Sequence, residues 1–233
     1  MLRTPARLLP GLMAACLLSG CSIEIQTGGG AQRPNQPQAK PAGPAPAPKR
    51  PKQAKAPPAP PARKKHPRVP VTATRVTSPT AFGNGKQGAF QGLAYVIPDS
   101  TKRIPAAAGL VPFAAVYTDR FDIKPQEFTS GFPGALMQTE WFLIQYEGEF
   151  KVPSAGKWQF RLVSDDGARL YIDDKLVVDN DGIHTAKQAD GEAELAAGPH
   201  WLRLEYFQAA RGPVALSLQT GQNGKLAPLV GAR

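Results

Sequence analysis

Residues 158–180 read WQFRLVSDDGARLYIDDKLVVDN, and this stretch decides the fold. Apolar and polar residues alternate on both sides of Asp165-Asp166-Gly167, which is the period of a strand with one buried face. Polar pairs such as Asp173-Asp174 are typical of turns. A two-residue hairpin turn usually has glycine at its second position, so Asp174 indicates mild strain or a longer turn. The stretch therefore predicts short strands joined by turns rather than helices.

The same alternation extends outward from this stretch in both directions. Turn signals recur at spacings of roughly eight to twelve residues from Gly88 onward, and no segment sustains a helical period. Leu93, Tyr95 and Ile97 share one face of an early strand. We predict an all-β fold, an antiparallel sandwich or barrel, over residues 81–233. The residues expected to face its core are Phe142, Ile144, Tyr146, Phe150, Val152, Trp158, Phe160, Leu162, Leu170, Ile172, Leu202, Leu204, Tyr206, Val214, Leu216 and Leu218.

Charge divides the chain into two unlike parts. Residues 1–80 carry 13 Lys and Arg against one acid, whereas residues 81–233 carry 15 Lys and Arg against 17 Asp and Glu. The net charge of +10 therefore comes from a basic segment attached to a nearly neutral domain. A nucleic-acid-binding fold would carry its basic patch on the domain itself, so nucleic acid is not an expected partner.

The N-terminal residues resemble the signal of bacterial lipoproteins. Arg3 and Arg7 precede an apolar run that is too short to span a bilayer, and small residues then lead to Cys21. Residues 1–20 are interpreted as the signal peptide and the Cys21 thiol as the acylation site that anchors the chain to a membrane. The alternative is a plain secretory signal with a chance cysteine. Because no aspartate follows Cys21, the lipoprotein pattern favours the outer membrane, with the domain either periplasmic or surface-exposed.

Residues 21–80 are interpreted as a disordered linker. Residues 31–80 hold 14 of the 25 prolines, and the segment has no aromatic residue with which to build a core. Proline and like charges favour an extended chain, so at about 3.1 Å per residue these residues would span on the order of 150 Å. Basic runs such as Arg63-Lys64-Lys65 either attract anionic envelope polymers or only keep the linker solvated.

Cysteine usage excludes two kinds of site from the processed chain. The two cysteines are Cys16, inside the apolar run, and Cys21, at the expected acylation site. Neither would remain as a free thiol. A cysteine nucleophile and a cysteine-ligated zinc site are therefore not expected, and neither is a disulfide.

The motifs between residues 141 and 218 follow one another in a recognisable order. They are Tyr146-Glu147-Gly148-Glu149-Phe150, Val152-Pro153, Ala155-Gly156, Ser164 to Asp173, Lys175 to Asn180, His184, Gly198 with His200, and Leu204-Glu205-Tyr206-Phe207. This order resembles the protective-antigen fourteen-kilodalton domain family, a β-sandwich or barrel module of anthrax protective antigen, fungal flocculins and adhesins, and bacterial glycosidases. Two features depart from the family pattern: Asp174 replaces a usual glycine, and the last strand lacks a frequent tryptophan.

The resemblance implies a binding module. In the flocculin branch, two adjacent aspartates joined by a cis peptide hold Ca²⁺, and the ion accepts two sugar hydroxyls. The matching residues here are Asp165 and Asp166, and Asn180 is the candidate for the asparagine that the flocculins add from another loop. Ca²⁺ prefers six to eight oxygen ligands, which carboxylates, an amide and hydroxyls supply.

Each of these polar residues also has a structural interpretation. Asp165 and Asp166 could cap a hairpin by accepting backbone N–H groups. His184 and His200 could be ligands or acids, but neither has a second histidine at metal-binding spacing, which favours structural roles. Three aromatic residues opposite the predicted inner face would either stack on sugar rings or pack beneath a cover, namely Tyr171, Trp201 and Phe207.

These observations predict a lipid-anchored protein of the bacterial envelope that displays a non-catalytic carbohydrate-binding domain on an extended stalk. Its partners would be the membrane and a glycan or envelope polymer. An enzyme is not expected, because a glycosidase needs two carboxylates flanking a cleft and Asp165 and Asp166 are adjacent. No serine-protease pattern and no phosphate-binding loop is present. The alternative is a structural or protein–protein interaction module with no metal or sugar site.

Overall fold

A computed structural model describes residues 72–232. The predicted signal peptide, Cys21 and most of the predicted linker lie outside the described residues. The described part contains twelve strands and no helix. The strands are β1 (Thr74–Arg75), β2 (Phe90–Val96), β3 (Ala114–Thr118), β4 (Asp122–Glu127), β5 (Phe142–Val152), β6 (Gly156–Asp165), β7 (Ala168–Ile172), β8 (Lys175–Asn180), β9 (Lys187–Leu195), β10 (Gly198–Gln208), β11 (Pro213–Gln222) and β12 (Lys225–Pro228).

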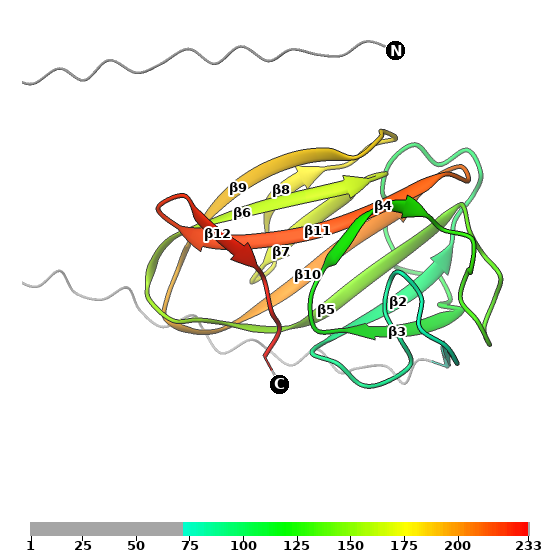
Figure 1. Cartoon of the computed structure of the whole chain (residues 1–233), viewed down its shortest axis with the longest axis horizontal. Coiled ribbons are helices and arrows are strands. Elements are labelled where there is room, and N and C mark those ends of the chain that lie inside the picture. The colour runs from blue at the N-terminus through cyan, green and yellow to red at the C-terminus, as the bar shows by residue number, and fades with distance from the viewer. Residues whose placement is uncertain (1–71, 233) are drawn as a thin grey trace, which may run out of the picture. The chain divides into compact units, whose positions relative to one another are not determined.

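The strands form two sheets that pack face to face (Figure 1). One sheet has the order β1-β3-β2-β5-β10-β7-β8, and the other has the order β12-β11-β6-β9 with β4 also paired to β11. Neighbouring strands run antiparallel except β1 and β3, which pair in parallel. Both sheets stay open, so of the two predicted architectures the sandwich is correct.

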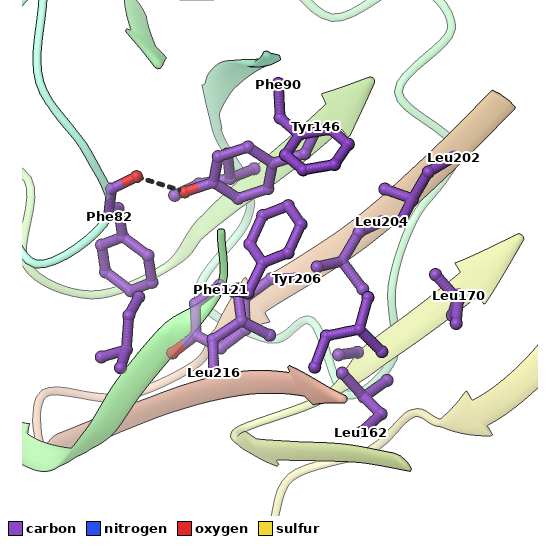
Figure 2. Packing of buried hydrophobic residues seen from close by; sticks show 14 of the residues in the cluster. Phe82, Phe90, Phe121, Tyr146, Leu162, Leu170, Leu202, Leu204, Tyr206 and Leu216 are labelled. Atoms are coloured by element: carbon purple, nitrogen blue, oxygen red, sulfur yellow. Dashed lines mark hydrogen bonds between the residues drawn. The ribbon is translucent and has the colours of Figure 1, made fainter. Parts of the chain in front are cut away.

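The core lies between the sheets and confirms the predicted inner faces. All sixteen side chains that the alternation assigned to the core are buried there. Figure 2 shows how the two layers meet, with Leu162 of β6 facing Leu170 of β7 and with Tyr146 beside Phe90. The Tyr146 hydroxyl donates a hydrogen bond of 2.6 Å to the Phe82 carbonyl, which satisfies the one polar atom that this ring carries into the core.

Residues 74–77, which precede the predicted start of the domain at residue 81, also pack against the sandwich. Thr74 and Arg75 pair with β3, and the Val76 side chain is 4% exposed within the core. Thr77 donates its backbone N–H to the Pro133 carbonyl at 2.8 Å. A segment with no aromatic residue can still add an edge strand, because backbone pairing makes no demand on side chains.

The apolar face of strand β2 points away from the core between the sheets, whereas its alternation alone would suggest that this face points inward. Leu93, Tyr95 and Ile97 do share one face, but that face is the outer one. Gly92 stands on the inner face, where a Cβ would lie 2.5 Å from Tyr146 Cε1. The outer apolar face is covered by the segment from Ile97 to Phe113, which joins β2 to β3. A second apolar cluster forms beneath it from Tyr95, Ile97, Ile104, Leu143, Phe207 and Ala209.

At one end of the sandwich four connections cross between the sheets (Figure 1), namely residues 128–141 between β4 and β5 and three connections that meet at the aspartate pair. Residues 166–167 join β6 to β7, residues 181–186 join β8 to β9, and residues 209–212 join β10 to β11. Each crossing leaves a hydrogen-bonded ladder, so its backbone groups need other partners. The aspartate pair singled out in the sequence lies at the crossing from β6 to β7.

Candidate functional site

Asp165 and Asp166 lie where the chain leaves one sheet for the other. Asp165 is the last residue of β6 and pairs with Ala215 of β11, whereas Ala168 already pairs with Tyr206 of β10. The peptide bond between the two aspartates is cis, as in the flocculin branch that the sequence resembles. Their side chains are 8% and 6% exposed, so both carboxylates are buried.

The Asp166 carboxylate connects the three crossings. Its Oδ1 accepts the backbone N–H of His184 at 3.1 Å, and its Oδ2 accepts the backbone N–H of Ala209 at 2.9 Å. One carboxylate therefore supplies acceptors to the β8–β9 and β10–β11 connections at once. The sequence interpretation of a local hairpin cap is wrong in detail, because these N–H groups come from distant segments.

Gly167 lets the crossings approach this closely. A Cβ at this position would lie 2.5 Å from Phe207 Cε1 and 2.7 Å from the backbone nitrogen of Gly182. Its carbonyl accepts the Phe207 N–H at 2.9 Å, which attaches the crossing to β10. Close packing rather than a left-handed backbone therefore explains the glycine.

Burial perturbs both carboxylates in the same direction. It raises the pKa of Asp165 above its ordinary value, and the neighbouring charge of Asp166 raises it further. Burial also raises the pKa of Asp166, against the opposing effect of its two backbone hydrogen bonds. In residues 72–232 neither carboxylate forms an ion pair with Lys or Arg, and the neighbouring His184 opposes the rise in both pKa values. The pair is therefore a buried concentration of negative charge that the described protein only partly balances.

Asn180 lies against the same crossing and is 3% exposed. Its Nδ2 donates to Ser164 Oγ at 2.8 Å and to the Lys187 carbonyl at 2.9 Å. Ser164 precedes the aspartate pair, so the amide is held next to it. Within the described part of the chain, Asn180 Oδ1 is buried and accepts no hydrogen bond. Because a carbonyl must accept from Nδ2, the free atom is the oxygen, which is the atom that a cation would need.

Asp179 and Asp181, which flank Asn180, contact other parts of the domain, and the sequence did not indicate these contacts. The Asp181 carboxylate accepts from Arg169 at 2.6 Å and from the Ile104 backbone N–H at 2.8 Å. It thereby fastens the β2–β3 segment to the β8–β9 connection. Asp179 lies 3.5 Å from the same arginine. Both carboxylates are consequently committed to Arg169, and neither belongs to the pair at Asp165.

The two histidines have structural partners, as the sequence favoured. His184 places its ring nitrogens 2.9 Å from the Asn180 carbonyl and 3.0 Å from the Thr185 carbonyl. His200 lies near the other end of its strand, with Nδ1 2.6 Å from Asp173 Oδ2 and Nε2 2.8 Å from the Ala196 carbonyl. His184 therefore shapes the connection beside the aspartate pair, and His200 does not approach it.

The three aromatic residues of the outer face differ in their surroundings. Phe207 is fully buried in the second apolar cluster. Tyr171 is half-buried, with the Arg203 guanidinium carbon 3.8 Å from its ring centroid. Trp201 is half-buried on the neighbouring strand. Of the two interpretations left open by the sequence, packing beneath a cover is correct for Phe207.

The residues at the crossing fit a calcium ion in their chemistry. In the described range 72–232, no group of three or more His, Cys, Asp or Glu side chains could hold a metal ion. A cation here would therefore be held by two carboxylates and an amide, with further oxygens from backbone or solvent. The buried charge of Asp165 and Asp166 and the free oxygen of Asn180 match the oxygen ligands that Ca²⁺ prefers.

Comparison with known proteins identifies the domain. Residues 127–228 match the sequence profile of the PA14 domain. This chain carries a PA14 domain. The name is that of the protective-antigen family predicted from the motif order, which confirms the resemblance. The matched range begins at the last residue of β4. Strands β1 to β3 therefore precede the matched range, although they belong to the larger sheet of the sandwich. No curated protein sequence matches the chain.

Two solved structures share this fold. The PA14 sugar-binding domain from an RTX adhesin is 19% identical, with a TM-score of 0.51 over 64% of this chain and 100% of that one. An anti-sigma factor domain-containing protein from Clostridium clariflavum is 18% identical, with a TM-score of 0.50 over 61% of this chain and 45% of that one. The chain thus spans less than half the length of the second protein. The described residues of this chain include no helix able to cross a membrane.

Proposed function

We propose that the PA14 domain is a non-catalytic carbohydrate-binding module whose site is organised by Ca²⁺ held by Asp165, Asp166 and Asn180. One observation carries the proposal. Two carboxylates are buried side by side without a Lys or Arg ion pair in residues 72–232, and their pKa values are raised as a result. Burying such a pair is costly unless a cation compensates it.

The surrounding residues support a binding role for this charge. Asn180 adds a buried oxygen with no hydrogen-bond donor among the described residues, and the Asp166 contacts keep the three crossings together. A bound Ca²⁺ would supply open coordination positions that accept two neighbouring sugar hydroxyls without proton transfer. The fold relative from an RTX adhesin is described as a sugar-binding domain, which agrees with this assignment.

The arrangement of the aspartates around the crossing supports a non-catalytic role. Asp165 and Asp166 are consecutive, whereas glycoside hydrolysis needs two carboxyl groups about 5 Å or more apart on opposite sides of the bond. Asp179 and Asp181 are occupied by Arg169. The proposed chemistry is therefore retention of a glycan rather than its cleavage.

We further propose that this module belongs to the bacterial envelope, a proposal that the N-terminal sequence supports. Cys21 would carry the lipid, and the proline-rich linker would hold the domain away from an outer-membrane surface. A Cys21→Ser variant is expected to move from the detergent phase to the aqueous phase in detergent partitioning. A Cys16→Ser variant is the control and should remain in the detergent phase.

The second candidate function is a structural or protein-interaction module. It is favoured by the Asp166 contacts, since a carboxylate that joins two connections has a sufficient role without any ion. In that case the domain would bind a protein partner in the same way with and without a chelator.

Calorimetric titration of Ca²⁺ into the full-length chain tests the proposal. We expect binding in the wild type and none in Asp165→Asn, which removes one charge yet keeps an oxygen for the Ala186 N–H that this carboxylate accepts. Asp122→Asn is the matched control, since Asp122 is exposed on β4 and should leave binding intact. No heat in the wild type, together with an unchanged melting temperature in chelator, would favour the structural module.

A further inference from the structure

The rim around the aspartate pair has a charge opposite to that of the domain as a whole. Three segments border it, residues 97–113, 181–187 and 209–212. They contain four exposed cations, Lys102, Arg103, Lys187 and Arg211, but one exposed acid, Asp99. One further carboxylate lies beside them, that of the half-buried Glu140, which accepts the backbone N–H of Arg211 at 2.8 Å. Residues 81–233 carry more acids than bases overall, 17 against 15. Exposed bases therefore outnumber exposed acids in these three segments.

Contacts of known length fix each cationic segment beside the site. Ile104, which follows Arg103, donates its N–H to Asp181 Oδ1 at 2.8 Å. Ala209, two residues before Arg211, donates to Asp166 Oδ2 at 2.9 Å. The Lys187 carbonyl accepts from Asn180 Nδ2 at 2.9 Å. The three segments also gather at one end of the molecule in Figure 1.

Within the described residues, these cations are not neutralised by carboxylates of the domain. Arg103 lies 3.8 Å from Asp181 Oδ2, but that carboxylate is already held by Arg169 at 2.6 Å, and the Arg103 side chain is 73% exposed. In residues 72–232, Lys102, Lys187 and Arg211 form no ion pair. Elsewhere on the domain, exposed bases such as Arg161 are paired across strands with acids such as Asp190 at 3.0 Å.

We infer that the saccharide bound at this site is acidic, carrying a carboxylate or sulfate that the rim cations meet while its hydroxyls face the aspartate pair. The inference rests on the proposed function and adds the chemical class of the ligand. A neutral sugar would offer the four exposed cations no charged partner. An anion would gain charge-assisted hydrogen bonds from Arg103 and Arg211 and point-charge attraction from the two lysines.

A glycan array with neutral, uronic-acid, sialylated and sulfated saccharides tests the inference on the full-length chain in Ca²⁺ and in chelator. The basic linker is identical in every arm, so the Ca²⁺-dependent signal isolates the domain site from non-specific attraction. We expect Ca²⁺-dependent binding confined to acidic saccharides. The uronic and sialylated spots separate a carboxylate from a sulfate as the group that is recognised.

Two variants with equal charge change decide the role of the rim. Lys102→Gln with Arg103→Gln and Arg211→Gln should weaken binding about tenfold, the expected sum of three exposed charge contacts. Lys124→Gln with Lys175→Gln and Lys225→Gln, all exposed and outside the rim, should leave it unchanged. Ca²⁺-dependent binding of neutral sugars, or undiminished binding by the rim variant, would overturn the inference and leave the proposed function standing. Failure to bind Ca²⁺ or any saccharide would overturn both.

Discussion

The chain contains two Asp-Asp pairs eight positions apart, and the two pairs have different partners and different surroundings. Asp165-Asp166 spans a crossing between sheets, is buried, and lacks a Lys or Arg partner in residues 72–232. Asp173-Asp174 forms the two-residue turn between β7 and β8, with φ of 49° and 66°. Asp173 accepts the Trp201 N–H at 3.0 Å and contacts His200.

The same Asp-Asp dipeptide therefore has a different role in each place, because its surroundings differ. At the turn, the left-handed backbone directs one carboxylate to a neighbouring imidazole, with Asp173 Oδ2 2.6 Å from His200 Nδ1. At the crossing, both carboxylates enter a region of backbone N–H groups that do not neutralise them. Only the second arrangement leaves charge available for a ligand, so the two pairs should respond differently to mutation, Ca²⁺ and pH.

The mutation expected to cost most stability disrupts the crossing at residues 166–167. Gly167→Ala places a Cβ 2.5 Å from Phe207 Cε1 and 2.7 Å from a backbone nitrogen, so the variant should lose about 3 kcal/mol of unfolding free energy. Chemical denaturation of the full-length chain measures the loss. Gly212→Ala is the control, because a Cβ there meets nothing within 4 Å. Equal stability of the two variants would show that the crossings are looser than described.

The second effect concerns the aspartate pair at the turn. Asp173→Ala deletes the acceptor for His200 and for the Trp201 N–H, and about 2 kcal/mol of stability should be lost. Ca²⁺ should raise the melting temperature of this variant as much as that of the wild type, because the turn lies away from the crossing. A lost Ca²⁺ response would contradict the separation of the two pairs.

A third and smaller effect distinguishes the two members of the buried pair. Asp166→Asn exchanges one acceptor oxygen for a donor that faces a backbone N–H, which should cost about 1 to 2 kcal/mol. Asp165→Asn instead removes buried charge, and it should stabilise the Ca²⁺-free chain slightly, by less than ~1 kcal/mol. Thermal melts in chelator compare them. Destabilisation of equal size in both variants would indicate that Asp165 is as fully hydrogen-bonded as Asp166.

The smallest expected effect is the pH dependence of the same pair. The folded-state pKa values of Asp165 and Asp166 lie above the ordinary value of 3.8, so the folded state binds protons more tightly than the unfolded state. The cost of the buried charge is fully present above the raised values and disappears as pH falls toward 3.8. The stability advantage of Asp165→Asn in chelator should therefore shrink between pH 7 and pH 4. An advantage that grows on acidification would reverse the sign of the shift.

Most of the β-structure could be predicted because alternation reports directly on strands with one covered face. Trp158, Phe160 and Leu162 required no tertiary information to be placed inward. Strand β2 did require it, because both of its faces are covered and its inner face carries Gly92 to make room for Tyr146. Alternation in such a strand indicates that two faces exist without indicating which one meets the core.

The candidate site divides in the same way. Three features could be predicted without the structure, since they depend on local order and period. They are the identity of the domain, the strand faces around residues 158–180 and the presence of an aspartate pair at a break between strands. Only the tertiary structure decided that Asp166 holds two distant connections, that Asp181 belongs to Arg169, and that basic side chains from three segments surround the pair. Those facts depend on which ends of which strands meet, and long-range packing sets that arrangement rather than the chemistry of neighbouring residues.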